Sequence, residues 1–225
     1  MHPPTAYRTG QLEFRGRTFR VNEHVYLTDP ELTELVDRVV QRGRELAAAL
    51  CRAPVIAEFG TGCGSLAISV KAELPEATVV ALEIDANAVA VARANVALHR
   101  VAIDVHQSDG FRDWPRDAGP DLIFGDPPWG DHSTVYDDGR PIEHYLAMPS
   151  TAVFPPDGSR IGCHRRILEE LRARGWPCEV WLNAGTLSAS DLHPLLNLAD
   201  SVTLFHPNAT LTHVHARFGP APGCG

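Results

Sequence analysis

The sequence predicts an α/β protein built on a mostly parallel, seven-stranded sheet, with an antiparallel strand at the C-terminus and a small β-hairpin at the N-terminus. Short apolar runs that suit buried strands alternate with segments of helical periodicity, which is typical of βαβ units. A glycine-rich loop follows the first of these runs and precedes a helix, as in doubly wound sheets. The last two runs are separated only by residues 206–210, which begin with His206-Pro207-Asn208, so we expect them to pair antiparallel.

The N-terminal part, residues 1–50, is expected to hold the hairpin and one helix, both packed on the core. Residues 11–27 alternate loosely between apolar and polar side chains, which indicates a small hairpin or an extended arm. The segment 28–31, Thr-Asp-Pro-Glu, is typical of a helix start because it offers an acidic cap followed by proline. The helix is expected to run to about Leu50.

Residues 51–225 are expected to form the main domain around the sheet. Its strands are predicted at residues 54–59, 78–83, 103–107, 121–125, 178–182, 201–205 and 211–218. Helices are predicted at residues 65–74, 86–98 and 165–174, and within 187–198. Residues 129–160 are rich in Asp, Gly, Pro and His and have little periodicity, so we expect a long functional loop.

Composition limits the partners and the compartment. The chain has 225 residues and a formal net charge of −8, which disfavours nucleic acid as a partner because phosphate backbones attract clustered Lys and Arg. Five cysteines without a C-x-x-C pair indicate reduced thiols rather than a disulfide framework or a zinc site. No secretory signal and no run of roughly 18 apolar residues is present. We therefore expect a cytoplasmic protein without membrane contact, and a homodimer remains open.

A glycine-rich loop, Glu58-Phe59-Gly60-Thr61-Gly62-Cys63-Gly64-Ser65, joins the first strand of the main domain to a helix. Glycines at such a place let the backbone turn sharply and pass close to a ligand. The spacing G-x-G-x-G differs from the G-x-G-x-x-G that seats a pyrophosphate, and the lysine of a P-loop is missing. The loop therefore favours a neutral nucleoside joined to an amino acid over a polyphosphate, and counts against a nicotinamide-dependent oxidoreductase.

Acidic residues follow the next two strands. Glu83 ends one strand, where a carboxylate faces the crevice beside the glycine loop and can accept from both hydroxyls of a ribose. Asp109 follows the third strand, and its carboxylate can accept from an adenine amino group, with Phe111 near the ring. Either carboxylate alone would be interpreted as a cap or turn residue. At successive strand ends, the two together favour a ligand site.

The fourth strand leads directly into Asp126-Pro127-Pro128-Trp129, which we predict to be catalytic. The prolines fix φ and lack N–H groups, so the backbone carbonyls are rigidly aimed. The Asp126 carboxylate and the Pro127 carbonyl can both accept from one N–H₂ group, while the Trp129 ring stacks on the acceptor. Such bonds direct the nitrogen lone pair toward a methyl donor. Pro-Pro alone would indicate only a rigid turn.

These motifs together resemble class I S-adenosylmethionine-dependent methyltransferases, most closely the HemK/PrmC group, which methylates glutamine side-chain amides in release factors. The resemblance is carried by the glycine loop, by residues 83–95 and by residues 107–111, and it extends over 19–31 and 157–168. It implies a Rossmann-like class I methyltransferase fold and S-adenosyl-L-methionine as the cofactor. The cofactor-binding residues that it implies are Glu58, Phe59, Gly60, Thr61, Gly62, Gly64, Glu83, Ile84, Ser108, Asp109, Gly110, Phe111 and Asp126.

The chain departs from that family in two ways. The family's tetrad is Asn-Pro-Pro-Tyr, whereas this chain has Asp-Pro-Pro-Trp, and the family's N-terminal helical substrate domain is expected to be missing. An ionised Asp126 can only accept hydrogen bonds, whereas asparagine also donates. We therefore predict an amine, guanidine, imidazole or exocyclic amino nitrogen as the acceptor in preference to an amide, on a small molecule, an amino-acid-type substrate or a protein side chain.

Two alternatives stay open at this point. A DNA or RNA adenine-amino (N6) methyltransferase would suit the tetrad, but the acidic composition opposes it. A non-catalytic adenosyl-binding subunit is opposed by the intact tetrad. Tyr26, Tyr136 and Tyr145 are expected to line the acceptor pocket together with Trp129. We predict no metal, because the spacing of the loop residues Asp131, His132, Asp137, Asp138 and His144 matches no standard ligand pattern.

Overall fold

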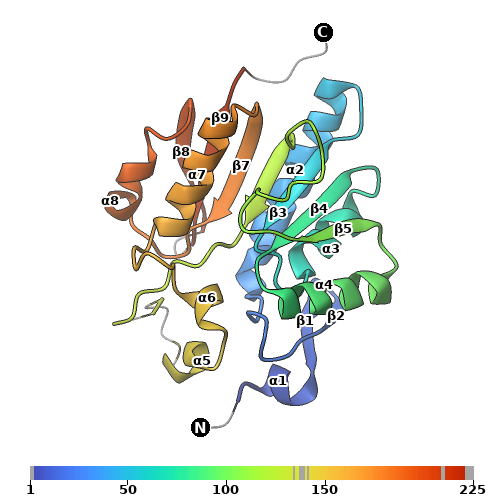
Figure 1. The fold of residues 1–225 in the computed structure, drawn as a ribbon, viewed down its shortest axis with the longest axis vertical. Helices are drawn as coiled ribbons and strands as arrows, with labels where there is room; N and C mark the ends of the chain where they lie inside the picture. Colours follow the sequence, from blue (N-terminus) through green and yellow to red (C-terminus); the bar gives the residue numbers. More distant parts are fainter. Residues whose placement is uncertain (1–2, 134, 137–139, 141, 209–210, 221–225) are drawn as a thin grey trace.

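A computed structural model of the chain describes residues 3–133, 135–136, 140, 142–208 and 211–220. Within these residues seven strands form one sheet in the order β5-β4-β3-β6-β7-β9-β8 (Figure 1). The first five strands of that order pair in parallel, and β9 runs antiparallel to both β7 and β8. The prediction of a mostly parallel sheet closed by an antiparallel strand is therefore confirmed. The strands are β3 (Val55–Phe59), β4 (Thr78–Glu83), β5 (Ile103–Gln107), β6 (Leu122–Gly125), β7 (Cys178–Asn183), β8 (Ser201–Asn208) and β9 (Leu211–Phe218).

Helices cover both faces of the sheet, and the alternation of side chains along each strand explains why both faces are apolar. Leu122 and Phe124 of β6 share one core cluster with residues of α2, α3 and α4. Ile123, between them, belongs to the cluster on the other face, which includes Ile167 and Leu168 of α7. The long helices are α2 (Thr33–Leu50), α3 (Ser65–Glu73), α4 (Ala86–His99) and α7 (Gly162–Arg174).

The N-terminal hairpin is joined to the main sheet through Asn95, a fully buried residue of α4. The hairpin consists of β1 (Gln11–Phe14) and β2 (Arg17–Arg20), after a short helix α1 (Thr5–Thr9). The Asn95 side chain accepts from the Arg20 N–H at 2.8 Å, and it donates to the carbonyls of Arg20 and Cys63. One buried amide therefore connects the hairpin, α4 and the glycine loop.

Several elements differ from the sequence-based expectation. The first long helix is preceded by a 3-10 turn, Pro30–Leu32. The helix expected within 187–198 is two short pieces, α8 (Ala189–Leu192) and the 3-10 turn His193–Leu195, because Pro194 lacks an N–H and interrupts the helical bonding. The expected loop 129–160 contains α5 (Ile142–Leu146) and α6 (Ser150–Val153), which lie near the hairpin end of the molecule in Figure 1.

Cysteines and hydropathy add two observations. Cys63, Cys163 and Cys178 are free and buried. Cys51 is disulfide-bonded, so the expectation of reduced thiols is wrong for this residue. In the part of the chain that the structure describes, none of the helices combines the length and the apolar character needed to cross a membrane.

Candidate active site

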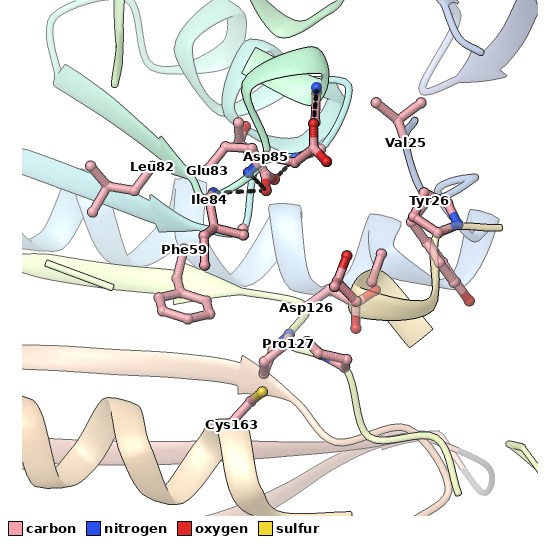
Figure 2. A pocket seen from close by; sticks show the side chains of 18 of the residues that line it. Val25, Tyr26, Phe59, Leu82, Glu83, Ile84, Asp85, Asp126, Pro127 and Cys163 are labelled. Atoms are coloured by element: carbon pink, nitrogen blue, oxygen red, sulfur yellow. Dashed lines mark hydrogen bonds between the residues drawn. The ribbon is translucent and has the colours of Figure 1, made fainter. Parts of the chain in front are cut away.

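A large cavity of about 440 Å³ lies where β3, β4 and β6 end, which is the edge at which open α/β sheets bind ligands. Figure 2 shows how side chains from these strand ends face it, together with residues of the N-terminal segment. We call it the large cavity. Of the residues that the resemblance implied for the cofactor, it is lined by Glu58, Phe59, Gly60, Thr61, Gly62, Glu83, Ile84, Ser108, Asp109, Gly110 and Asp126.

The glycine loop has a backbone conformation that side chains disfavour. Gly60 has φ 67° and Gly62 has φ 53°, both in the left-handed region. A Cβ added at either position would meet nothing within 4 Å, so the conformation and not crowding requires glycine. The Gly62 N–H donates to Glu83 Oε2 at 2.8 Å, and the Thr61 N–H donates to the Leu82 carbonyl at 3.0 Å. The loop is therefore fixed against the end of β4.

Glu83 is oriented by backbone amides. Its Oε1 accepts from the N–H of Ile84 at 2.8 Å and of Asp85 at 3.1 Å (Figure 2). Burial raises the pKa of Glu83, and the three backbone N–H groups partly offset that effect. The Ile84 side chain next to it is 54% exposed and lines the large cavity. The Glu83 carboxylate, oriented by backbone amides, suits the hydroxyls of a ribose. The apolar Ile84 side chain beside it suits the flat base of a nucleoside.

Glu58 lies beneath the loop and is almost fully buried. Its Oε2 accepts from the Thr61 hydroxyl and from the Ala67 N–H, the latter at 3.1 Å. Burial raises the pKa of Glu58 to about 8. The carboxyl group therefore carries a proton near neutral pH and ties the loop to α3.

Two residues that the sequence placed among the cofactor ligands do not line the cavity. Phe111 has no exposed surface, and its ring packs against those of Phe59, Trp114 and Trp176, so it supports the wall from behind. Gly64 is the N-cap of α3 and has φ 84°, so its left-handed backbone conformation is what favours glycine there.

Asp109 does line the large cavity, but its carboxylate already has a partner. Its Oδ1 accepts from Arg166 Nη2 at 2.6 Å. Arg166 comes from α7 and lines the same cavity. An adenine amino group at this place would therefore share Asp109 with a guanidinium group.

The tetrad begins where β6 ends, and the neighbouring strand supplies a partner for its aspartate. The register pairs Gly125 with Leu182, so Asp126 and Asn183 follow side by side. Asn183 Nδ2 donates to Asp126 Oδ1 at 2.7 Å, while Asn183 Oδ1 accepts from the Gly185 N–H at 3.1 Å. The second bond fixes which end of the amide faces Asp126. Sequence reasoning missed Asn183, whose only signal is a polar residue at the end of a buried strand.

The charge state of Asp126 differs from the expectation. Burial raises its pKa to about 7, the hydrogen bond from Asn183 opposes that shift, and the nearby Asp29 adds to it. The sequence argument treated Asp126 as fully ionised. Near neutral pH the structure instead supports both the carboxylate and the neutral acid, so Asp126 can also donate a hydrogen bond, as asparagine does.

A small cavity of about 40 Å³ lies on the other side of the tetrad. Five residues line both cavities: Tyr26, Leu32, Asp126, Pro127 and Ala152. Trp129 lines only the small cavity and is mostly buried, with its ring centroid 4.2 Å from that of Tyr136. Pro128 lines only the large cavity. The two cavities therefore meet at Asp126 and Pro127.

The remaining sequence-predicted residues are placed as follows. Tyr136 lines the small cavity, but Tyr145 is fully buried and lines neither cavity, although its ring lies 4.7 Å from that of Tyr136. Asp137 and Asp138 lie outside the described residues. Residues from segments 24–28 and 149–156 form the outer wall of the large cavity, and among them sequence reasoning singled out only Tyr26.

Comparison with known proteins agrees with this geometry. Residues 43–142 match the family model of the methyltransferase small domain. A release factor glutamine methyltransferase of Enterococcus faecalis is 26% identical over 87% of this chain and 68% of its own length. One from Bacteroides thetaiotaomicron is 32% identical over 74% of this chain and 57% of its own length. The chain thus spans between about half and two thirds of these relatives.

Solved structures share the fold at low sequence identity. The N-terminal domain of human METTL16 in complex with SAH has a TM-score of 0.62 and 15% identity, covering 90% of this chain and 76% of that one. The T. thermophilus 16S rRNA methyltransferase RsmC in complex with AdoMet and guanosine has a TM-score of 0.64 and 16% identity, covering 93% of this chain and 50% of that one. The chain therefore carries a methyltransferase small domain on a Rossmann-like fold, and it is similar to the HemK/PrmC release factor glutamine methyltransferases.

Proposed function

We propose that this protein transfers a methyl group from S-adenosylmethionine to a nitrogen atom held where the two cavities meet. The observation that carries the proposal is that Asp126 and Pro127 line both cavities. A donor in the large cavity and an acceptor in the small one would then approach each other at the tetrad, which is the proximity that a direct transfer requires.

The large cavity fits the cofactor. Its volume of about 440 Å³ lies within the ~300–1,000 Å³ of ordinary ligand pockets. Glu83 would accept from the ribose hydroxyls, Ile84 would cover one side of the base, and Gly60 with Gly62 would let the backbone approach the amino-acid part. When bound, S-adenosylmethionine supplies a methyl group activated by a sulfonium charge.

The chain's own residues orient the acceptor. Asn183 donates a hydrogen bond to Oδ1 of Asp126, and no hydrogen bond to Oδ2 is found among the described residues. Oδ2 and the Pro127 carbonyl are therefore the two oxygens that can accept from one nitrogen. Holding both N–H groups leaves the lone pair directed away from them, and a carboxylate nearby stabilises the positive charge that develops on nitrogen.

The acceptor class follows only in part from the relatives. They are named for a glutamine side chain in a release factor, which supports a protein side chain as one acceptor class. A small molecule with a similar nitrogen group is the other. The net charge of −8 opposes a nucleic-acid acceptor.

The test is transfer of label from methyl-labelled S-adenosylmethionine into an extract of the source cells, followed by separation by size and by protease and nuclease sensitivity. We expect protein-bound or small-molecule label that disappears with Asp126→Ala. Asp104→Ala is the matched control, because Asp104 lies on the edge strand β5 and its side chain is 62% exposed. Nuclease-sensitive label, or label that survives Asp126→Ala, would contradict the proposal.

A further inference from the structure

We infer that the small cavity accepts a protonated nitrogen group, an ammonium or a guanidinium, in preference to the carboxamide that the homologues' names indicate. The inference rests on the proposed function and narrows it to one substrate chemistry. It is argued from the charges, the hydrogen-bond donors and the rings that line this cavity.

Carboxylates dominate the charged lining. Asp29, Glu31 and Asp126 line the small cavity, whereas Arg140 is the basic side chain among its described lining residues. Arg140 Nη1 forms an ion pair with Asp29 Oδ1, so one acidic charge is already balanced. Glu31 remains as a negative group in the lining, and Asp126 adds a second negative charge above about pH 7. A positive group placed there gains Coulomb energy, and it gains more than in water because part of the wall is apolar.

The hydroxyl and amide donors of the lining are already in use. A carboxamide needs a donor for its carbonyl oxygen as well as acceptors for its N–H₂ group, and a buried carbonyl without a donor is costly. The amide and hydroxyl side chains that line the cavity donate to protein acceptors instead: Tyr26 to Asp29, Asn183 to Asp126, Tyr136 to Val153 and Thr186 to Tyr136. Of the other side-chain donors, Arg140 Nη1 binds Asp29, so a carboxamide oxygen would depend on the other N–H groups of Arg140, on the Trp129 indole N–H or on the protonated form of Asp126.

Aromatic rings favour the same ligand. Tyr26, Trp129 and Tyr136 line the small cavity, and the faces of such rings attract cations. The Arg160 guanidinium already lies 5.5 Å from the Trp129 centroid, so the rings of Tyr26 and Tyr136 are the ones available to a cationic ligand. A cavity of about 40 Å³ admits only a compact head group, so the nitrogen itself and not a bulky neighbour must supply the recognition.

A protonated nitrogen must lose a proton before its lone pair can react, and Asp126 lies where that proton can go. The N–H bond breaks and the proton passes to Oδ2 of Asp126. The freed lone pair then forms the N–C bond while the C–S bond breaks, and the electron pair of that bond stays on sulfur. Burial raises the pKa of Asp126 to about 7, which makes its carboxylate a stronger base than an exposed aspartate.

The test compares three probes of similar length on the full chain loaded with S-adenosylhomocysteine: n-butylammonium, n-butylguanidinium and butyramide. Dissociation constants are measured by NMR titration at pH 7.5. At least one cation should bind about 10-fold more tightly than butyramide. Glu31→Gln should weaken binding of the cation about 3- to 10-fold and leave binding of butyramide unchanged, because Glu31 lines the small cavity, is exposed and contributes mainly charge. Glu76→Gln, an exposed residue away from both cavities, is the control.

Each outcome is decisive. Butyramide binding as tightly as the cations, or no binding by any probe to protein that holds S-adenosylhomocysteine, overturns the inference. Equal weakening by Glu31→Gln and Glu76→Gln also overturns it. The proposed function fails separately, if the protein transfers no label from S-adenosylmethionine. A protein that transfers label yet prefers butyramide refutes the cation inference alone.

Discussion

Replacing Asp126 by asparagine should stabilise the protein increasingly as the pH rises from 5 to about 7. Burial raises the pKa of Asp126 from 3.8 to about 7. A group whose pKa is raised on folding contributes stability that is fully present below its unfolded pKa and is lost as the pH rises through the folded pKa. The wild type therefore loses this contribution between about pH 4 and pH 7, whereas Asp126→Asn has no such titration.

The size of the effect follows from the shift. Each pH unit between the two pKa values costs about 1.4 kcal/mol, so the interval from pH 5 to 7 corresponds to about 3 kcal/mol. Asp126 is only partly shielded, because it faces two cavities that admit water. Solvent screening reduces the expected difference to about 1–2 kcal/mol, or roughly 2–8 °C in Tm for a chain of this length.

The assay is urea denaturation of the wild type, Asp126→Asn and Asp104→Asn at pH 5, 6, 7 and 8. Asp126→Asn should gain stability relative to the wild type up to about pH 7 and then level off. Asp104→Asn should follow the wild type, since the Asp104 side chain is 62% exposed. A stability difference between Asp126→Asn and the wild type that does not change with pH would refute the reasoning, because the Asp126 carboxyl would then titrate alike in the folded and unfolded chain.

Three further predictions concern the walls of the cavities. Glu83→Gln should weaken the binding of S-adenosylhomocysteine about 10-fold, as measured by calorimetry, because a neutral amide accepts hydrogen bonds from hydroxyls more weakly than a carboxylate does. An unchanged affinity would show that Glu83 does not bind the ribose. Gly185→Ala should cost about 2–3 kcal/mol of unfolding free energy, since its Cβ would lie 1.9 Å from Trp129 Cζ2, and a loss below about 1 kcal/mol would show that Trp129 moves freely. Asn183→Ala removes the donor to Asp126 and should raise the titration midpoint of that carboxyl by about one unit in carbon-detected NMR, whereas a lower midpoint would contradict the assigned bond.

The fold could be predicted because its signals are local. Apolar runs such as 78–83 have the length and composition of buried strands, and they match β4 to the residue. The positive φ of Gly60 and Gly62 also follows from a local pattern, since glycine tolerates the left-handed conformation. Helix bounds near Pro194 were less accurate, because apolar periodicity continued through a proline that interrupts the backbone bonds.

The site could be predicted only where it follows the strand ends. Asp126 and Glu83 were found because the ends of parallel strands share one edge of the sheet. Asn183 lies 57 residues from Asp126 in the sequence, so its contact depends on strand order, which one sequence does not reveal. Arg166 was missed for the same reason. Burial could not be predicted from the sequence either. Tyr145 lies in a polar stretch of the sequence, yet its side chain is buried in the core.

The shared wall of the two cavities has a consequence for kinetics. Tyr26, Asp126 and Pro127 belong to both linings, so a molecule in one cavity changes the surface and the charge that the other presents. Affinities coupled in this way are reciprocal. If bound S-adenosylhomocysteine changes the affinity for the acceptor by some factor, the bound acceptor changes the affinity for S-adenosylhomocysteine by the same factor. Inhibition by S-adenosylhomocysteine should therefore depend on the acceptor concentration. The turnover rate should depend on which of the two products, S-adenosylhomocysteine or the methylated acceptor, dissociates first.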